Sequence, residues 1–282
     1  MKRTGLFFTY FQGERLRDFP QALEGVLDKD NVSYYDAHYT SRDGLFYIEP
    51  IPEALVLKVH SIGMVDEIKR TGDYDAALYG VSGTVQAARE IMDGKLDNAF
   101  IFTSWGDHHA GSDFFGGMCY LNGAAIAIAD LREKGVRRFC IVDTDAHHAD
   151  GTRDIFVEDP DVLHVCFCDQ DYSDSFNKVD VDIPVHTTDD DFMARMEHEF
   201  LPRVARFKPE VIFWEFGYDA TRGEYADKGL TPDCHIRIAR LVKAAADGVC
   251  QGRLVAILCG GSGRMVASYA IPRIISAMAE LD

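Results

Sequence analysis

The sequence predicts an α/β protein in which helices flank a single open parallel β-sheet. Short apolar segments typical of strands alternate along the chain with longer segments of helical spacing, a pattern typical of a parallel sheet covered on both faces. The 282 residues contain no internal repeat, low-complexity tract or linker rich in Gly, Ser and Pro. We therefore expect residues 1–282 to form one domain, with ample length for a substantial core.

The first half of the chain opens with an apolar segment, Thr4–Tyr10, which we expect to form a strand. Apolar residues at helical spacing predict a helix over Glu14–Leu27, and a second strand is expected at Val32–Tyr35. Pro52 suits the first turn of a helix and precedes Glu53–Leu57. The other elements expected in this half are a short helix within His60–Ile68, an amphipathic helix over Ala76–Ile91, a strand over Asn98–Thr103 and an apolar helix over Cys119–Glu133.

The second half continues the same alternation. Strands are expected at Arg138–Val142, Val162–Cys168, Val211–Phe216 and Leu254–Leu258. A helix that begins at Thr152 should end at Asp159-Pro160, because proline cannot continue a helix. The remaining expected helices are Phe192–Phe207 with a kink at Pro202, Pro232–Asp247, and a final helix after the turn at 260–264.

The composition is that of a globular protein with an acidic surface. A net charge of −17 argues against a nucleic-acid partner, because phosphate binding needs a basic surface. No apolar run approaches the ~18 residues of a membrane span, and the apolar patch near the N-terminus is too short for a signal peptide. Seven cysteines without a Cys-x-x-Cys pair fit reduced core thiols. We expect a cytoplasmic protein and make no prediction of its oligomeric state.

Metal-binding residue types are concentrated after the strand that ends at Val142. Three aspartates and two adjacent histidines lie within Asp143–Asp150. Asp145 and His147 are two residues apart, so on an extended backbone their side chains point the same way. A carboxylate oxygen and an imidazole nitrogen directed at one point suit Zn²⁺ or another first-row divalent metal. The alternative is a polar loop in which the histidines form hydrogen bonds.

Three other expected strands also end in conspicuous residues, namely the pair His108 and His109, then Asp219, then the glycine turn at 260–263. Because the carboxyl ends of parallel strands meet at one edge of a sheet, we expect these segments to converge on one crevice.

Several neighbouring residues can be explained without a role in the site. His60 and His148 are expected to be structural, and Asp107 is either a solvated charge or a functional one. Cys166 and Cys168 could share one face of a strand, but two thiols alone are weak evidence for a metal site.

In their order along the chain, these landmarks resemble the motifs of the histone deacetylase family, which includes acetylpolyamine amidohydrolases and acetoin-utilisation proteins. The resemblance covers roughly residues 50–265, and the matching segments are Asp107-His108-His109-Ala110, Gly117–Asn122, Asp143–Gly151 and Gly217–Ala220. It implies a single open α/β sheet flanked by helices, in agreement with the fold predicted above.

The resemblance also implies the ligands of two cations. Asp145, His147 and Asp219 would bind a catalytic Zn²⁺ ion, with Fe²⁺ as the alternative, and would leave open positions for water and substrate. Family members bind a monovalent cation as well, through backbone carbonyls and the side chain at Asp143. Cys166 stands where the family usually has serine at that site, so a structural potassium ion near Asp143 and Cys166 is a weaker expectation.

Proton transfer would fall to two histidines. The resemblance implies that His109 is the general base and that His108 is its electrostatic partner. Asp143 would pair with His108 and Asp150 with His109, because a carboxylate fixes the tautomer of an imidazole and raises its basicity.

One motif departs from the family pattern. Where the family reads Gly-Gly-Tyr and uses the tyrosine hydroxyl as oxyanion donor, this chain reads Gly260-Gly261-Ser262-Gly263-Arg264. Either Ser262 or Arg264 takes the tyrosine position, depending on the register, and Tyr269 lies too far along to be a simple substitute. Met118 replaces the usual phenylalanine of the substrate tunnel. A mobile tyrosine from elsewhere is a further alternative.

The expected activity is hydrolysis of a linear amide, releasing an acyl group from a small-molecule or peptide amine such as acetyl-lysine or an acetylpolyamine. A second enzymatic hypothesis is an arginase-like ureohydrolase, because Asp145-Ala146-His147 resembles a motif of that family. That chemistry needs a second metal beside Asp219, where no acid stands two residues away, so we expect one transition metal per chain. The non-enzymatic alternative is a metal protein that binds an acylated ligand.

Overall fold

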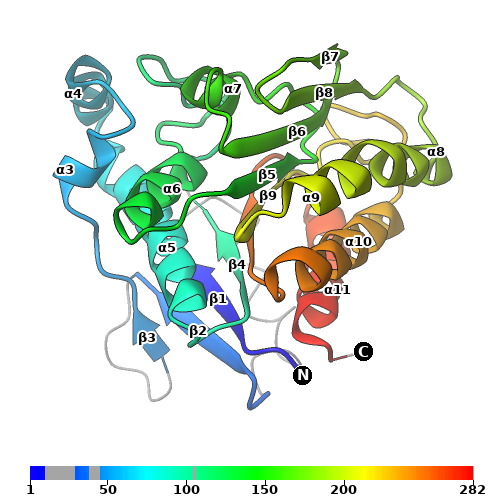
Figure 1. The fold of residues 1–282 in the computed structure, drawn as a ribbon, viewed down its shortest axis with the longest axis horizontal. Coiled ribbons are helices and arrows are strands. Elements are labelled where there is room, and N and C mark those ends of the chain that lie inside the picture. The colour runs from blue at the N-terminus through cyan, green and yellow to red at the C-terminus, as the bar shows by residue number, and fades with distance from the viewer. Residues whose placement is uncertain (10–28, 38–44, 104–105, 282) are drawn as a thin grey trace.

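The computed structural model describes residues 1–9, 29–37, 45–103 and 106–281. The strands in these ranges form one sheet in the order β3-β2-β1-β4-β10-β9-β5-β6-β8-β7 (Figure 1). Their bounds are β1 Thr4–Phe8, β2 Val32–Asp36, β3 Leu45–Tyr47, β4 Asn98–Phe102, β5 Phe139–Asp143, β6 Val162–Cys168, β7 Tyr172–Ser173, β8 Lys178–Asp182, β9 Val211–Phe216 and β10 Leu254–Leu258. Every neighbouring pair is parallel except β7 and β8.

Helices cover both faces of this sheet (Figure 1). One face carries α3 Glu53–Val56, α4 Ile62–Thr71, α5 Tyr74–Met92, α6 Gly123–Glu133 and α7 Asp150–Phe156. The other face carries α8 Asp189–Arg195, a π-helical segment Met196–Phe200, α9 Leu201–Phe207, α10 Pro232–Cys250 and α11 Arg264–Ala279. Among the helices of the described ranges, none is long and apolar enough to cross a membrane.

Strand β4 shows how the sheet is buried from both sides. Phe100 and Phe102 belong to the core on the α10–α11 face, whereas Ala99 and Ile101 belong to the core on the α5–α6 face. Because successive strand residues point to opposite faces, a strand covered on both sides is apolar at most positions, as Ala99–Phe102 are here. The predicted open sheet with helices on both faces is confirmed.

The sheet is mixed rather than wholly parallel, because β7 runs antiparallel at one edge. Strands β3, β7 and β8 were not expected from the sequence. β8 reads Lys-Val-Asp-Val-Asp over Lys178–Asp182, an alternation of polar and apolar residues typical of a strand, which the sequence analysis did not use. The helix expected at Glu14–Leu27 lies outside the described residues.

Two expected helices begin or run differently from the prediction. α6 begins at Gly123 instead of Cys119, because the side chain of Asn122 accepts a hydrogen bond from Ala125 N and caps the helix. The helix expected at Phe192–Phe207 is divided into α8, the π-helical segment and α9. The irregular segment ends just before Pro202, which has no N–H to donate to the preceding turn.

The strand order determines where the conspicuous side chains meet. β4, β10, β9 and β5 are consecutive across the middle of the sheet and parallel to one another. The segments that follow these four strands therefore emerge side by side at its carboxyl edge.

Candidate active site

Three predicted metal ligands lie together at this edge. Asp145 and His147 follow β5, and Asp219 follows the neighbouring strand β9. His147 Nδ1 lies 2.9 Å from Asp145 Oδ1 and 2.9 Å from Asp219 Oδ2. Both carboxylates are buried, whereas the His147 side chain is 43% exposed. The group is therefore closed on its protein side and open toward solvent.

The donor atoms fit a divalent metal ion. Metal–ligand bonds of about 2.0–2.2 Å in a tetrahedral arrangement place donors roughly 3.3–3.6 Å apart, and these donors need only a small outward shift to reach that spacing. Within the described residues, buried Asp219 Oδ2 has no partner in hydrogen-bond geometry. The carboxylates of Asp145 and then Asp219 raise the pKa of His147 to about 10. The same negative potential would stabilise a bound dication.

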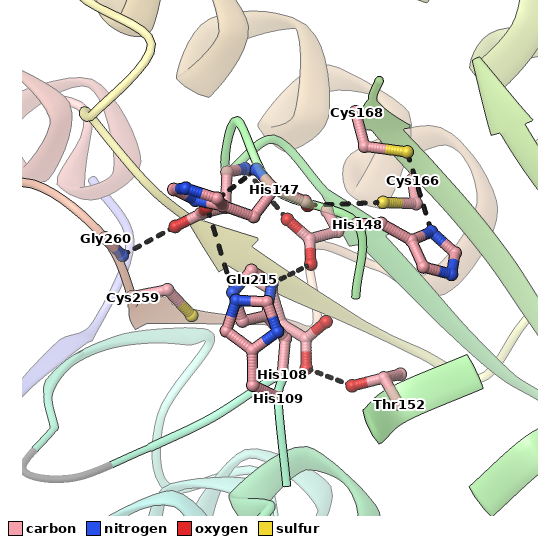
Figure 2. Close-up of polar contacts among 12 residues, drawn as sticks. His108, His109, His147, His148, Thr152, Cys166, Cys168, Glu215, Cys259 and Gly260 are labelled. Atoms are coloured by element: carbon pink, nitrogen blue, oxygen red, sulfur yellow. Dashed lines mark hydrogen bonds and ion pairs between the residues drawn. The ribbon is translucent and has the colours of Figure 1, made fainter. Parts of the chain in front are cut away.

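Two glycines allow the carboxylates to approach so closely. A Cβ atom at Gly217 or at Gly260 would overlap with Asp145 Oδ2. Gly260 N donates a hydrogen bond of 2.7 Å to the same oxygen (Figure 2). The glycine turn after β10 thus orients the predicted ligand Asp145 through its backbone.

The structure brings both predicted histidine–aspartate pairs together. His108 Nδ1 lies 2.7 Å from Asp143 Oδ2, and His109 Nδ1 lies 2.6 Å from Asp150 Oδ1. The two imidazole rings are adjacent, with centroids 4.1 Å apart (Figure 2). His108 is buried, whereas the His109 side chain is 18% exposed, so His109 is the more accessible member. Gly117, at a φ of 54°, contacts the His109 ring so closely that a Cβ there would overlap it.

Asp143 has a second acidic neighbour that the sequence analysis missed. Glu215 is its register partner on β9 and is fully buried. Thr152 donates a 3.0 Å hydrogen bond to Glu215 Oε1 (Figure 2). Burial, reinforced by nearby carboxylate charge, raises the pKa of both Asp143 and Glu215. The signal in the sequence was a charged residue inside an otherwise apolar strand.

Asp107 is neither solvated nor part of the reacting group, and the interpretation as a solvated charge is wrong. Its carboxylate is buried and accepts hydrogen bonds from Gly123 N and Ala124 N at the start of α6. An acid is stabilised there by the unpaired N–H groups of a helix N-terminus. Because Asp107 immediately precedes His108, this cap anchors the histidine segment to α6.

Ser262 and Arg264, the two residues predicted to take the place of the family tyrosine, lie in different surroundings. The backbone N and the hydroxyl of Ser262 both donate to Glu224 Oε2, at 2.9 and 3.1 Å. Arg264 is the first residue of α11 and is exposed. The Tyr269 hydroxyl donates to Asp233 Oδ1 at 2.8 Å, on the outer side of α11. Whether Ser262 or Arg264 takes part in catalysis stays a prediction.

A different tyrosine packs on the predicted metal ligand His147. The ring of Tyr225 stacks on His147 at a centroid distance of 5.8 Å, and Gly261 N donates to its hydroxyl at 3.0 Å. Tyr225 belongs to the segment after β9 and is 61% exposed. It reaches the glycine turn from another segment of the chain. A loop tyrosine has no periodicity or motif that would have identified it.

The structure also brings together the residues expected near a monovalent cation. Asp143 and Cys166 are register partners on β5 and β6. The Cys166 thiol lies 3.9 Å from the carbonyl oxygen of His147 (Figure 2). Met118, expected in the tunnel wall, is 69% exposed.

Comparisons with known proteins point to one family. The family model of the histone deacetylase domain matches residues 47–278. A probable deacetylase of Archaeoglobus fulgidus is 32% identical over 282 residues, covering 92% of this chain and 77% of that protein. Acetylpolyamine amidohydrolase 1 of Pseudomonas aeruginosa is 39% identical over 122 residues, which cover 43% of this chain and only 34% of that protein. The crystal structure of the HDA15 HD domain shares the fold, with a TM-score of 0.82 over 99% of this chain and 90% of that chain at 22% identity.

Proposed function

The chain belongs to the histone deacetylase family, and from that premise we propose that it is a metal-dependent amidohydrolase that removes an acyl group, most simply acetyl, from an amine. The observation that carries the proposal is the meeting of Asp145, His147 and Asp219 beside two histidine–aspartate pairs. A protein that only binds its ligand would need the first group but not the second.

Asp145, His147 and Asp219 would hold the metal ion, Zn²⁺ or Fe²⁺. When bound, such an ion lowers the pKa of a water molecule and polarises the amide carbonyl of the substrate. Three protein ligands leave coordination positions open, as catalytic metal sites require. The exposed side of His147 is the side from which a substrate would approach.

His109 is the proposed general base. It is the more accessible histidine, and its bond to Asp150 leaves Nε2 to take a proton from the attacking water. The same proton would then pass to the leaving amine. His108 is buried against Asp143 and is less accessible than His109, so its proposed role is that of an electrostatic partner to His109.

Tyr225 is the proposed donor to the substrate carbonyl oxygen. Its ring packs on His147, and its hydroxyl is fixed by Gly261 N next to the metal ligands. A phenol placed there supplies the hydrogen bond that the family obtains from the tyrosine of its Gly-Gly-Tyr turn. Ser262 is engaged by Glu224, which favours Tyr225 over Ser262 for this role.

The proposed substrates are acetyl-lysine peptides and acetylated polyamines. The relatives include a protein named an acetylpolyamine amidohydrolase. The chain carries a net charge of −17, and an acidic surface attracts cationic amines in general.

The test is a turnover assay of the zinc-loaded and iron-loaded chain against both substrate classes. We expect acyl release, and we expect His109→Ala to reduce kcat by at least about 10²-fold with its metal content unchanged. His198→Ala is the matched control, because His198 is 84% exposed on the π-helical segment. No acyl release at full metal occupancy would refute the proposal. Ligand affinity without turnover would support the binding-protein alternative.

A further inference from the structure

A second group of donor atoms lies on the other side of His147. It consists of His148 after β5, Cys166 and Cys168 on β6, and Asp180 on β8, with all four donor atoms within 4.8 Å of one another. Cys166 and Cys168 are two residues apart and share one face of β6, and Asp180 is the register partner of Cys166. Figure 2 shows both sulfur atoms next to the imidazole of His148. The strand register alone therefore assembles three of the four donors.

Two distances in this group match those expected around a bound metal ion. Cys168 Sγ lies 3.7 Å from His148 Nδ1, and His148 Nδ1 lies 3.5 Å from Asp180 Oδ1. Around a tetrahedral zinc ion, bonds of about 2.3 Å to sulfur and about 2.0–2.2 Å to nitrogen and oxygen place these pairs roughly 3.6 and 3.4 Å apart. A hydrogen bond from imidazole to carboxylate is shorter, at about 2.7–3.2 Å. These two pairs are thus already at the spacing that a zinc ion needs, and the remaining donor pairs lie within 4.8 Å.

Burial and charge also suit a closed metal site. Cys166 and Cys168 are fully buried and Asp180 is 2% exposed, while the His148 side chain is 18% exposed and provides the path to solvent. Two thiolates and a carboxylate around a dication carry one net negative charge. Arg153 donates to both oxygens of Asp180, at 2.9 and 2.6 Å, and supplies the compensating positive charge.

We propose that His148, Cys166, Cys168 and Asp180 bind a zinc ion that is distinct from the one proposed at Asp145, His147 and Asp219. Four protein ligands make this a structural site, and two thiolates select zinc over magnesium or calcium. The ion would join the β5 loop to β6 and β8, and so hold His148 next to a ligand of the active site. The proposal assigns the Cys166 sulfur to zinc and leaves Asp143 and backbone carbonyls for a monovalent cation.

Metal analysis of the zinc-reconstituted chain tests the proposal. We expect two zinc ions per chain in the wild type, one in Asp145→Ala and one in Cys168→Ala. Cys140→Ala is the matched control, because Cys140 is equally buried on the adjacent strand β5 and outside the group, so it should keep two. One zinc in the wild type and none in Asp145→Ala would overturn the proposal.

Cobalt substitution separates this site from any other second metal. Cobalt bound to thiolates gives a near-ultraviolet charge-transfer band, which we expect in Asp145→Ala and not in Cys168→Ala. If Cys168→Ala fails to fold, the spectrum of Asp145→Ala decides alone, and the absence of the band overturns the proposal. A second metal held beside Asp219, as in an arginase-like site, would give no thiolate band. Because turnover is not measured, failure here leaves the proposed activity untouched.

Discussion

The buried histidine His60 should make the protein sensitive to mild acid. Asn122 N donates to His60 Nε2 at 3.0 Å, so Nδ1 carries the ring proton and donates to the carbonyl of Gly111 at 2.7 Å. A second proton would sit on Nε2 and point at the N–H of Asn122, so that two donors would face each other. Burial lowers the pKa of His60 to about 4, whereas an unfolded histidine titrates near 6.5.

The sign follows from proton counting. Between pH 6.5 and 4 the unfolded chain binds the extra proton and the folded chain does not, so stability falls as the pH falls through this window. A pKa difference of this size corresponds to about 3 kcal/mol in total, of which about 2 kcal/mol should be lost between pH 7 and pH 5.

Replacement by glutamine isolates this contribution. The His60→Gln side chain has a donor for Gly111 O and an acceptor for Asn122 N but does not titrate. Chemical denaturation at pH 7 and pH 5 should show the wild type losing about 2 kcal/mol more free energy of unfolding than the variant. His164 and His235, whose pKa values burial also lowers, contribute to both proteins and cancel. Equal losses in the two proteins would refute the reasoning.

Three further changes probe the site. Tyr225→Phe should reduce kcat by about 10²–10³-fold with metal content unchanged. Its control is Tyr269→Phe, which loses only the hydrogen bond to Asp233. Equal kcat values in the two variants would contradict the role of Tyr225. Gly217→Ala should lose its metal by elemental analysis, because the new Cβ overlaps a metal-binding carboxylate, while Gly248→Ala on α10 meets no atom within 4 Å and should keep it. Glu215→Gln should retain wild-type turnover within a few-fold, because burial raises the pKa of this carboxyl and so favours the neutral form that glutamine resembles. A loss as large as that of His109→Ala would show that its charge is needed.

The sequence predicted the active-site group well, for a reason of geometry. Parallel strands deliver whatever follows them to one edge, so the residues after four apolar segments could be placed together without knowing the strand order. His108, Asp145 and Asp219 were found in this way, and the structure brings them together. The roles of these residues remain proposals that the experiments above address.

The features that could not be predicted from the sequence depend on contacts between distant segments, and such contacts leave no repeating pattern in the sequence. Tyr225 reaches His147 through the irregular path of the segment after β9. The thiols of Cys166 and Cys168 were visible, but their pairing with Asp180 depends on the register between β6 and β8, which the sequence does not give. Asp107 could not be recognised as a cap, because only the folded chain brings it to the N–H groups of α6.

The bond between Gly260 N and Asp145 joins residues 115 positions apart. The predicted metal ligands and their backbone support therefore come together only once β5, β9 and β10 have paired. A metal ion that meets this geometry recognises the native state and not the unfolded chain, so it stabilises folding by mass action. A substitution far from the site that weakens sheet assembly would consequently present itself as a weaker apparent affinity for metal.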